Sequence, residues 1–450
     1  MYDHPRISIR PVLLSLLLLA APTAAQAQFD YTTNADGVSI TITGYTGPGG
    51  AVTIPTNING LTVTSIGEEA FLLYSGLTSV GIPGSVTNIG SGAFEQCKNL
   101  TNVIMDNGVT SIGTGAFGDC SFLANVVLPN GLISIGGNAF VYCASLTNVT
   151  IPDSVTNIGS AAFAASGLMS VTIPAIVSNI GSEAFGGNPD LTSVTVPGSL
   201  FSGQYDFYAV FGYGLNLKTV TIANGVTSIA EGFFGGMYGG DNQLTSVSIP
   251  ASVTNIADYA FDQCFGLTNV TLSYGLSTIG EQAFFDCSHI TNLTIPASVT
   301  YIGASAFSAC AYMSGDFFAG NAPTVPVGSP PFNQIETIYY LPGTTGWSNT
   351  FSGQPAVLWN PQIQAGGTSF GGSNNQFGFN IAGTSDIPIV VEACTNLVGS
   401  TWTPLKKLTL TNGLVYFSEP LQTNSSGRFT ASVRRKPLLP LRHWDFATLR

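Results

Sequence analysis

Apolar and polar positions alternate within a short unit of this chain that returns many times. In the stretch LTNVTIPDSVTNIGSAAF, residues 146–163, a period of two predicts a strand with Val149 and Ile151 inward and Asn148 and Thr150 outward. Because this pattern puts apolar side chains on one face only, the unit needs a neighbour to cover that face.

The rest of the unit predicts a turn, a second extended piece and a return. Pro152 ends the first strand because proline has no backbone N–H to donate to a ladder. Residues 155–158 form the second extended piece, and Gly159 permits the bend that follows. Residues 160–163 bring the chain back, either as a helical turn or irregularly.

The unit repeats about every 23 residues. Leucine or isoleucine opens each copy, at Leu77, Leu100, Leu123, Leu146, Leu168, Leu191, Leu217, Leu244, Leu267 and Ile290. An internal period of 20 to 50 residues is typical of stacked repeats, so the sequence predicts a repeat solenoid with a parallel β-sheet.

Phenylalanine and cysteine also keep the repeat phase. Phenylalanine stands at one repeat position, namely Phe71, Phe94, Phe117, Phe140, Phe163, Phe185, Phe234, Phe261, Phe284 and Phe307. Six cysteines follow some of them, at Cys97, Cys120, Cys143, Cys264, Cys287 and Cys310. This regularity favours buried, unpaired thiols stacked rung on rung, with one or two disulfides as the alternative.

The full string Leu-Thr-x-Val-x-Ile-Pro-x-Ser-Val-Thr-x-Ile-Gly-x-x-Ala-Phe-x-x-Cys resembles the BspA-like, Treponema-type leucine-rich repeat over roughly residues 51–313. The resemblance implies a right-handed solenoid with one parallel sheet, on exported or surface proteins that bind ligands or adhere. It offers no catalytic residues. Two units depart from the pattern, because Leu191 to Leu217 spans 26 residues and Leu217 to Leu244 spans 27.

The flanking segments predict further parts of the chain. We expect a signal peptide at 1–27, an N-terminal β cap at 28–50, repeats at 51–313, a C-terminal cap at 314–360 with a last strand at 336–342, a linker at 361–376, a small β-sandwich-like module at 377–433 and a flexible tail at 434–450. Within the module, Asn412-Gly413 is typical of a hairpin turn.

The N-terminal segment and the charges bear on location and partners. Arg6 and Arg10 precede an apolar run, and Ala25-Gln26-Ala27 fits a cleavage site after Ala27, so we expect a secreted or cell-surface protein. Residues 28–405 hold 21 acidic and two basic side chains, whereas residues 406–450 hold eight basic and two acidic ones. An acidic surface argues against nucleic acid as a partner. No stretch of the mature chain predicts a transmembrane segment.

The chain is poorly supplied for catalysis, metals or cofactors. Beyond the signal segment it holds only His289 and His443, and His289 is expected at the surface. Carboxylates such as Glu68, Glu69 and Glu183 could serve glycoside hydrolysis, but they suit solvated positions. We therefore expect no enzyme, no metal site and no cofactor, with a glycan-active enzyme as the remote alternative.

The outward strand positions and the two longer units remain as candidate binding surfaces. Two outward columns carry hydroxyls and amides, represented by Asn148, Thr150, Asn269 and Thr271, and the longer units add Tyr205, Asp206, Tyr208, Tyr213 and Tyr238. Solenoids offer extended surfaces to partners. The sequence thus favours a protein that binds an extracellular protein or polysaccharide. The alternatives are a structural spacer attached through the C-terminal module and, for the columns, simple strand ladders.

Overall fold

The computed structural model describes residues 28–201, 207–212, 216–235, 244–291, 293–313, 316–332, 337–364, 371–373, 376–385, 387–394, 403–420, 430–434 and 447–448. Two compact units divide the chain. The first runs to Val253 and includes Cys264–Leu267, and the second holds Thr254–Gln263 and the chain from Thr268 onward. The expected signal peptide, residues 1–27, lies outside the described residues.

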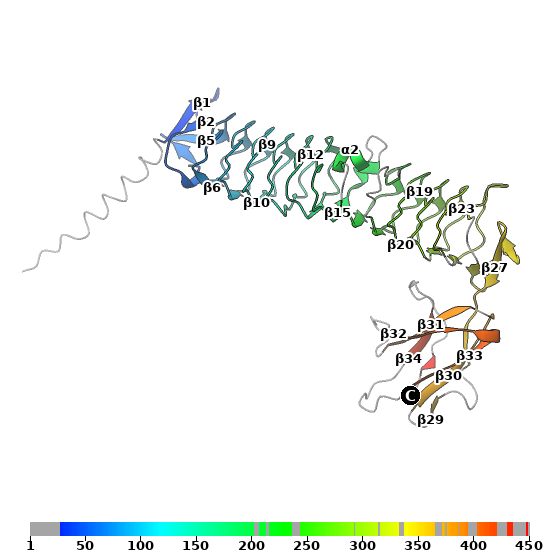
Figure 1. Cartoon of the computed structure of the whole chain (residues 1–450). Helices are drawn as coiled ribbons and strands as arrows, with labels where there is room; N and C mark the ends of the chain where they lie inside the picture. The colour runs from blue at the N-terminus through cyan, green and yellow to red at the C-terminus, as the bar shows by residue number, and fades with distance from the viewer. Residues whose placement is uncertain are drawn as a thin grey trace, which may run out of the picture. The chain divides into compact units, whose positions relative to one another are not determined.

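A β hairpin begins the described chain (Figure 1). β1 (Phe29–Thr33) pairs antiparallel with β2 (Ser39–Tyr45), and β2 pairs parallel with β5 (Leu61–Ile66). The Asp36 carboxylate holds the hairpin turn by accepting hydrogen bonds from the Ser39 hydroxyl and from the amides of Val38 and Ser39. These bonds, the Ser39 hydroxyl foremost, lower the pKa of Asp36. The hairpin therefore covers the open end of the first rung.

The first strands of most repeats stack in register with their neighbours, one repeat apart, as with Asn102 opposite Asn125. In the first unit these parallel strands are β3 (Gly50–Thr53), β6 (Leu77–Ile82), β8 (Asn102–Met105) and β10 (Asn125–Val127), then β13 (Ser170–Thr172), β15 (Ser193–Val196), β16 (Thr219–Ile222) and β18 (Ser246–Ser248). We call the outward side of these strands, and of the corresponding first strands of the second unit, the strand face of that unit.

The strand predicted at Leu146–Ile151 is not paired in the structure. The alternation itself holds, because Val149 and Ile151 are buried while Asn148 and Thr150 are exposed. The gap in the ladder between β10 and β13 coincides with the one spacing of 22 residues between openers, from Leu146 to Leu168. The missing residue lies after the return, because Ser166 and Leu168 are two positions apart where Cys143 and Leu146 are three apart, and the inward packing continues across the gap.

The second extended piece of each unit forms a second parallel ladder of two-residue strands. These are β7 (Asn88–Ile89), β9 (Ser111–Ile112), β11 (Ser134–Ile135), β12 (Asn157–Ile158) and β14 (Asn179–Ile180), and they continue the sheet that starts at β5. Their isoleucines point inward and are at most 1% exposed. Most rungs thus contribute two short strands, one to each of two separate ladders.

The return, which the sequence left open, is neither helix nor strand. In the rung of Phe140, the amides of Asn138, Phe140 and Tyr142 donate to the next rung, whereas the amides between them close local turns. Asn138 and Tyr142 both have positive φ, near 55°. This conformation costs a residue with a side chain about 1 to 2 kcal/mol, and the ladder of hydrogen bonds to the next rung offsets that cost. We call the outer surface of these turns the return face.

The glycines before several returns lie close to a neighbouring backbone. The chain turns directly after Gly159 as expected, but Gly159 does not have a positive φ. A Cβ on Gly136 would lie 2.5 Å from the carbonyl carbon of Gly113, and one on Gly159 would lie 2.3 Å from the amide nitrogen of Gly137. Neighbouring backbones come this close at Gly136 and Gly159, so a Cβ there would force the chain to shift, whereas Ala230 and Ala257 hold the equivalent position in later rungs.

The predicted phenylalanine column is confirmed as a continuous stack in each unit. From Phe71 to Phe185 successive ring centroids are 4.8 to 5.5 Å apart, and in the second unit Phe261, Phe284, Phe307 and Phe332 are 4.9 to 5.4 Å apart. Phe94 through Phe185 are fully buried. This stack forms the centre of the core.

The first long unit replaces its second strand and its return with helical turns. They are η1 (Gly198–Phe201) and α2 (Phe207–Phe211). Phe211 stacks on Phe185 at 5.7 Å and so takes the place of the missing repeat phenylalanine. Phe207, Phe211 and Phe233 are buried, so the described phenylalanines of the extensions pack locally.

The second unit contains further rungs of the same kind, followed by the C-terminal cap. Its strands are β19 (Asn255–Ile256), β20 (Asn269–Thr271), β21 (Thr278–Ile279), β22 (Leu293–Ile295), β23 (Tyr301–Ile302), β24 (Asp316–Phe318), β25 (Ile338–Tyr340), β26 (Thr350–Phe351) and β27 (Gln354–Leu358). The strand expected at 336–342 is β25. An antiparallel β26–β27 hairpin follows it.

An antiparallel module follows the cap in the same unit. Its strands are β28 (Gln362–Gln364), β29 (Gly371–Ser373), β30 (Gln376–Ala382), β31 (Pro388–Cys394), β32 (Thr403–Thr409), β33 (Leu414–Pro420), β34 (Thr430–Arg434) and β35 (Ala447–Thr448). The segment expected as a linker contributes β28 and β29, which both pair with β30. Within the segment expected as a tail, β35 pairs with β34.

The expected hairpin at Asn412-Gly413 is wrong. These residues have positive φ, as a hairpin turn needs, but they connect two different sheets. β32 pairs with β31, and β33 pairs with β30. A local turn signal shows that the chain reverses, but only the long-range partners decide which strands pair.

The core of the module reaches back onto the cap. It contains Phe379, Ile389 and Phe417, and Tyr339 and Val357 of the cap pack against it. Tyr339 and Val357 continue an outward column of the strand face, since Thr294 lies in register with Phe317, Phe317 with Tyr339, and Tyr339 with Val357. In the second unit the module therefore rests on the strand face at its last strands.

Candidate functional site

Two outward columns run along the strand face of the first unit, and neither holds a charged side chain. The first column is Ser79, Asn102, Asn125, Asn148, Ser170, Ser193, Thr219 and Ser246, and the second is Gly81, Ile104, Val127, Thr150, Thr172, Thr195, Thr221 and Ser248. Parallel pairing in register sets side chains of one column about 4.8 Å apart. The surface is a regular array of small polar groups.

Hydroxyls beside these columns serve the stack itself. The hydroxyls of Thr101, Thr192 and Thr245, which stand one position before the first column, donate to carbonyls of the preceding rung at 3.0 to 3.3 Å. Within the first column, the Asn102 amide donates to the Ser79 hydroxyl at 3.2 Å. These three threonine hydroxyls therefore serve the stack, whereas for the two columns the alternative of simple strand ladders stays a prediction.

The four predicted strand-face residues are all exposed. Asn148 and Thr150 lie in the gap between β10 and β13, and Asn269 and Thr271 lie on β20 in the second unit. In the described part of the chain none of the four side chains makes a hydrogen bond. They are therefore available to a partner, but the structure describes the two pairs in different units.

The predicted aromatic candidates lie mostly outside the description. Tyr205, Asp206, Tyr213 and Tyr238 are not among the described residues, and Tyr208 is described only as backbone of α2.

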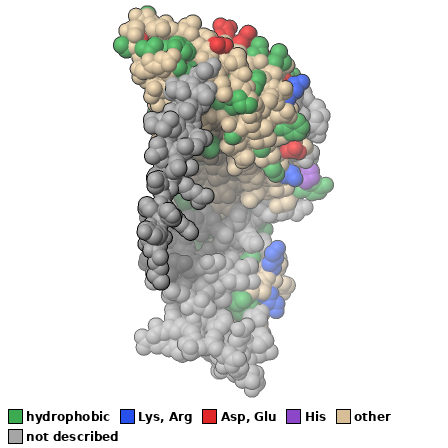
Figure 2. Space-filling model, turned by 90° about the vertical axis from the view of Figure 1, so that its left-hand side faces the viewer, with side chains coloured by type: hydrophobic (Ala, Val, Ile, Leu, Met, Phe, Trp, Pro, Cys, Tyr) green, Lys and Arg blue, Asp and Glu red, His purple; other side chains and the backbone are tan. Residues whose placement is uncertain are grey.

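Two apolar side chains interrupt the polar array near its beginning. Ile104 and Val127 lie side by side in the second column, 49% and 56% exposed. Sequence reasoning assigned them to an outward column, where threonine is the usual residue in later rungs. In the view of Figure 2 most described side chains are uncharged, and charged ones are scattered.

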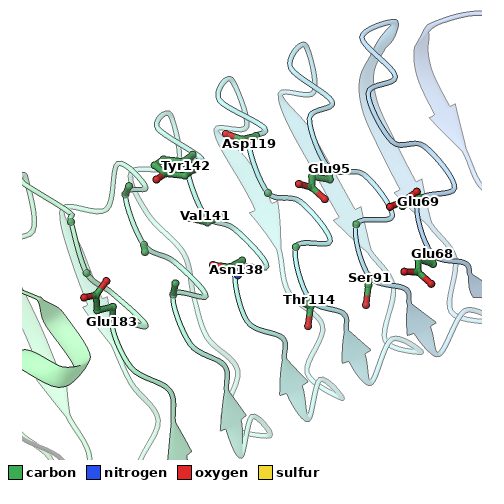
Figure 3. A pocket seen from close by; sticks show the side chains of 18 residues that line it. Glu68, Glu69, Ser91, Glu95, Thr114, Asp119, Asn138, Val141, Tyr142 and Glu183 are labelled. Atoms are coloured by element: carbon green, nitrogen blue, oxygen red, sulfur yellow. The ribbon is translucent and has the colours of Figure 1, made fainter.

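The acidic side chains gather instead on the return face. In the first unit, a groove of about 690 Å³ crosses several rungs and is lined by Glu68, Glu69, Glu95, Asp119 and Glu183, beside the exposed Tyr142 (Figure 3). The carboxylates come from different rungs, and Glu183 lies at the far end from Glu68 (Figure 3). Sequence reasoning expected Glu68, Glu69 and Glu183 as exposed charges, which they are.

The second unit has a smaller acidic pair on the same side of its rungs. Burial raises the pKa of Asp262, and the charge of Asp286 raises it further, while burial raises the pKa of Asp286. The described residues include no group of three or more His, Cys, Asp or Glu side chains that could hold a metal ion. His289 is exposed as expected, with its ring 5.5 Å from that of Tyr312.

The six repeat-phase cysteines are buried and carry free thiols, as the regular spacing indicated. Each thiol donates to the carbonyl of the phenylalanine one rung back, as Cys143 does to Phe117 at 3.2 Å. Burial raises the pKa of Cys97 and of Cys143 to about 12. These thiols act as core donors and have little thiolate character.

Sequence reasoning missed the two polar residues that replace cysteine in this column. The buried Asn188 amide donates to the carbonyls of Phe163 and Phe185, and its side-chain oxygen accepts from Ser166 at 2.9 Å. The repeat phase was the available signal, because Ser166 and Asn188 each stand three residues after a stacked phenylalanine, like the cysteines.

Comparison with known families decides the classification. The family model for the BspA type leucine rich repeat region (6 copies) matches residues 52–166, 122–238 and 236–326. The chain belongs to this family. BspA-type proteins are repeat proteins and typically bacterial surface proteins.

Solved structures of leucine-rich repeat proteins are similar to this BspA-type chain. A leucine rich cell surface protein from Faecalibacterium prausnitzii A2-165 is 30% identical, with 64% of this chain and 86% of that one covered, at a TM-score of 0.35. A T. pallidum leucine rich repeat protein is 28% identical over 51% and 84%, at 0.32. The pneumococcal vaccine antigen PcpA is 22% identical over 70% and 86%, at 0.38. The comparison with curated proteins finds no match.

Proposed function

We propose that this BspA-type protein is exported and binds an extracellular macromolecule, a protein or a polysaccharide, through its strand face without catalysis. The observation that carries the proposal is the outward, uncharged side chains of each unit: Asn148 and Thr150 in the first unit, and Asn269 and Thr271 in the second, make no side-chain hydrogen bond in the described part of the chain. Polar groups that the stack does not use are free to pair with a ligand.

Export rests on the N-terminal segment. Residues 1–27 have the charges, apolar run and small-residue site of a secretory signal, with cleavage expected after Ala27. Among the described residues, no helix has the length and apolarity needed to cross a bilayer. The typical surface location of the family agrees with export.

The proposal includes the extensions of the two longer units, which are rich in aromatic residues, as a second region that contacts the ligand. Tyr205, Asp206, Tyr208, Tyr213 and Tyr238 concentrate within two long units, and tyrosine supplies large contact area at interfaces. Insertions in repeat proteins usually lie on one face.

A structural spacer is the second candidate. The observation that favours it is the packing of Tyr339 and Val357 of the cap against the core of the C-terminal module, because a shared apolar core holds two parts at a set angle. A spacer attached through the module predicts no saturable ligand.

The test is saturable binding by the mature chain, residues 28–450, to a panel of polysaccharides, matrix-type proteins and bacterial surfaces. We expect the double variant Asn148→Asp/Asn269→Asp to bind the ligand more weakly while the protein stays folded. The matched control is Asn130→Asp with Asn224→Asp, since both asparagines are exposed at turns beyond the strands. Equal loss in both variants would contradict a strand-face site, and the absence of any saturable ligand would favour the spacer.

The aromatic region is tested by a separate variant. Alanine at Tyr205, Tyr208 and Tyr238 is expected to reduce binding if the extensions contribute contacts. Unchanged binding by a folded triple variant would restrict the site to the strand face.

A further inference from the structure

The last four strands of the strand face in the first unit carry two outward hydroxyls each. β13, β15, β16 and β18 present a Ser-x-Thr, Ser-x-Thr, Thr-x-Thr and Ser-x-Ser pattern, in register from strand to strand. We call these eight side chains the hydroxyl patch. Its centre is Ser193 and Thr195 on β15 with Thr219 and Thr221 on β16.

The stack does not use the hydroxyls of this patch. Thr192, directly before Ser193, donates to the Met169 carbonyl at 3.3 Å, yet no side chain of the patch makes a hydrogen bond within the described residues. Each hydroxyl can donate one bond and accept two. The patch therefore keeps its whole hydrogen-bonding capacity for solvent or a ligand.

The hydroxyl patch is uncharged. None of its eight side chains carries a charge, and the charged residue nearest in sequence is Lys218, one position before Thr219. Five carboxylates of the first unit line the groove on the return face instead. A surface without charge gives no electrostatic advantage to a charged partner, so it matches an uncharged ligand best.

The side-chain types weigh against a protein partner. Protein interfaces obtain most of their affinity from buried Trp, Tyr and Arg anchors, and the patch has none of these residue types. A neutral polysaccharide instead presents hydroxyls at every unit. Strands about 4.8 Å apart repeat their donors and acceptors at nearly the length of one sugar unit in an extended chain.

We propose that the hydroxyl patch binds a neutral polysaccharide in extended form, with the glycan chain running across the strands. The inference rests on the proposed strand-face function and names its ligand class. Each rung supplies only weak neutral hydrogen bonds, so affinity accumulates over several sugar units. Binding should then rise steeply with chain length and change little with salt.

The experiment measures retention of the mature chain in native gels that contain a soluble mixed-linkage β-glucan, a galactomannan, the anionic polygalacturonate or no polymer. The test variant combines Ser193→Ala, Thr195→Val, Thr219→Val and Thr221→Val, which remove hydroxyls but keep most of the shape. Ser91→Ala with Thr114→Val is the matched control on the return face, where both residues are exposed. A variant with Thr195→Ser and Thr221→Ser keeps the hydroxyls.

We expect a neutral glycan to retard the wild type, the control and the serine variant, and the test variant to lose about tenfold or more in affinity. Between about 0.05 and about 0.5 M salt the retardation should stay constant. Thermal melts confirm that each variant is folded.

Four results would overturn the inference. Retention by polygalacturonate alone, or capture of a protein from the panel that the test variant loses, would refute the ligand class and leave the proposed strand-face function standing. Neutral glycan binding that the folded test variant keeps but the Asn148/Asn269 variant loses would move the site along the strand face. Failure of every glycan and every protein to bind the wild type would refute this inference and the proposed function together.

Discussion

Replacing Phe140 by alanine tests the stacked core directly. Its ring is fully buried and lies between Phe117 and Phe163, at centroid distances of 5.3 and 5.2 Å with nearly parallel planes. Truncation of a buried phenylalanine to alanine costs about 3 to 5 kcal/mol, the loss of transfer free energy plus the cavity. Because the change removes stacking on two sides, we expect a loss in the upper half of that range.

Urea-induced unfolding of the mature chain, followed by circular dichroism, measures this loss. Phe122→Ala is the matched control, because Phe122 is 59% exposed and its removal should change the free energy of unfolding by no more than about 0.5 kcal/mol. In a nearly one-dimensional stack the effect should stay local. Hydrogen exchange should therefore show the greatest loss of protection at amides of the Phe117, Phe140 and Phe163 rungs. The reasoning is refuted if both variants lose equal stability.

Other substitutions test the remaining contacts of the core. Gly136→Ala should cost about 2 to 4 kcal/mol, since its Cβ would lie 2.5 Å from Gly113, whereas Gly131→Ala, with 3.4 Å to the nearest atom, should be tolerated in the same urea titration. Asn188→Ala should cost about 1 to 3 kcal/mol because it removes the side-chain donor to the Phe185 carbonyl, whereas the Phe163 carbonyl and the Ser166 hydroxyl keep their bond to each other, and Asn188→Cys should recover part of the loss, since thiols fill this position in other rungs. Burial raises the pKa of Cys97 and of Cys143 to about 12. In the native state these two thiols therefore keep protons that they lose in the unfolded state above a pH of about 9. The free energy of unfolding should therefore fall as the pH rises from about 9 to about 12, by roughly 1 kcal/mol per pH unit for each thiol. Cys143→Ser should make this pH dependence less steep. An unchanged pH dependence would contradict the burial of the Cys143 thiol.

The repeat pattern alone was enough to predict the fold class, the inward residues and the phenylalanine stack. A 23-residue period with one apolar side per unit has few solutions, because each rung can bury that side only against another rung. For the same reason the spacing of the cysteines indicated buried thiols, which the structure confirms. Local alternation also identified the outward residues, including Asn148 and Thr150, from which the candidate site was built.

Features that depend on contacts between rungs were decided only by the tertiary structure. Phe211 enters the stack from α2, although its position does not follow the repeat, because a packed column leaves a space that a ring must fill. Gly159 is explained by a neighbouring backbone 2.3 Å from its missing Cβ, which no local signal reveals. Which hydroxyls remain free likewise depends on the carbonyl one rung away: Thr192 reaches such a carbonyl and is used by the stack, whereas Thr195 points away from the core and stays available.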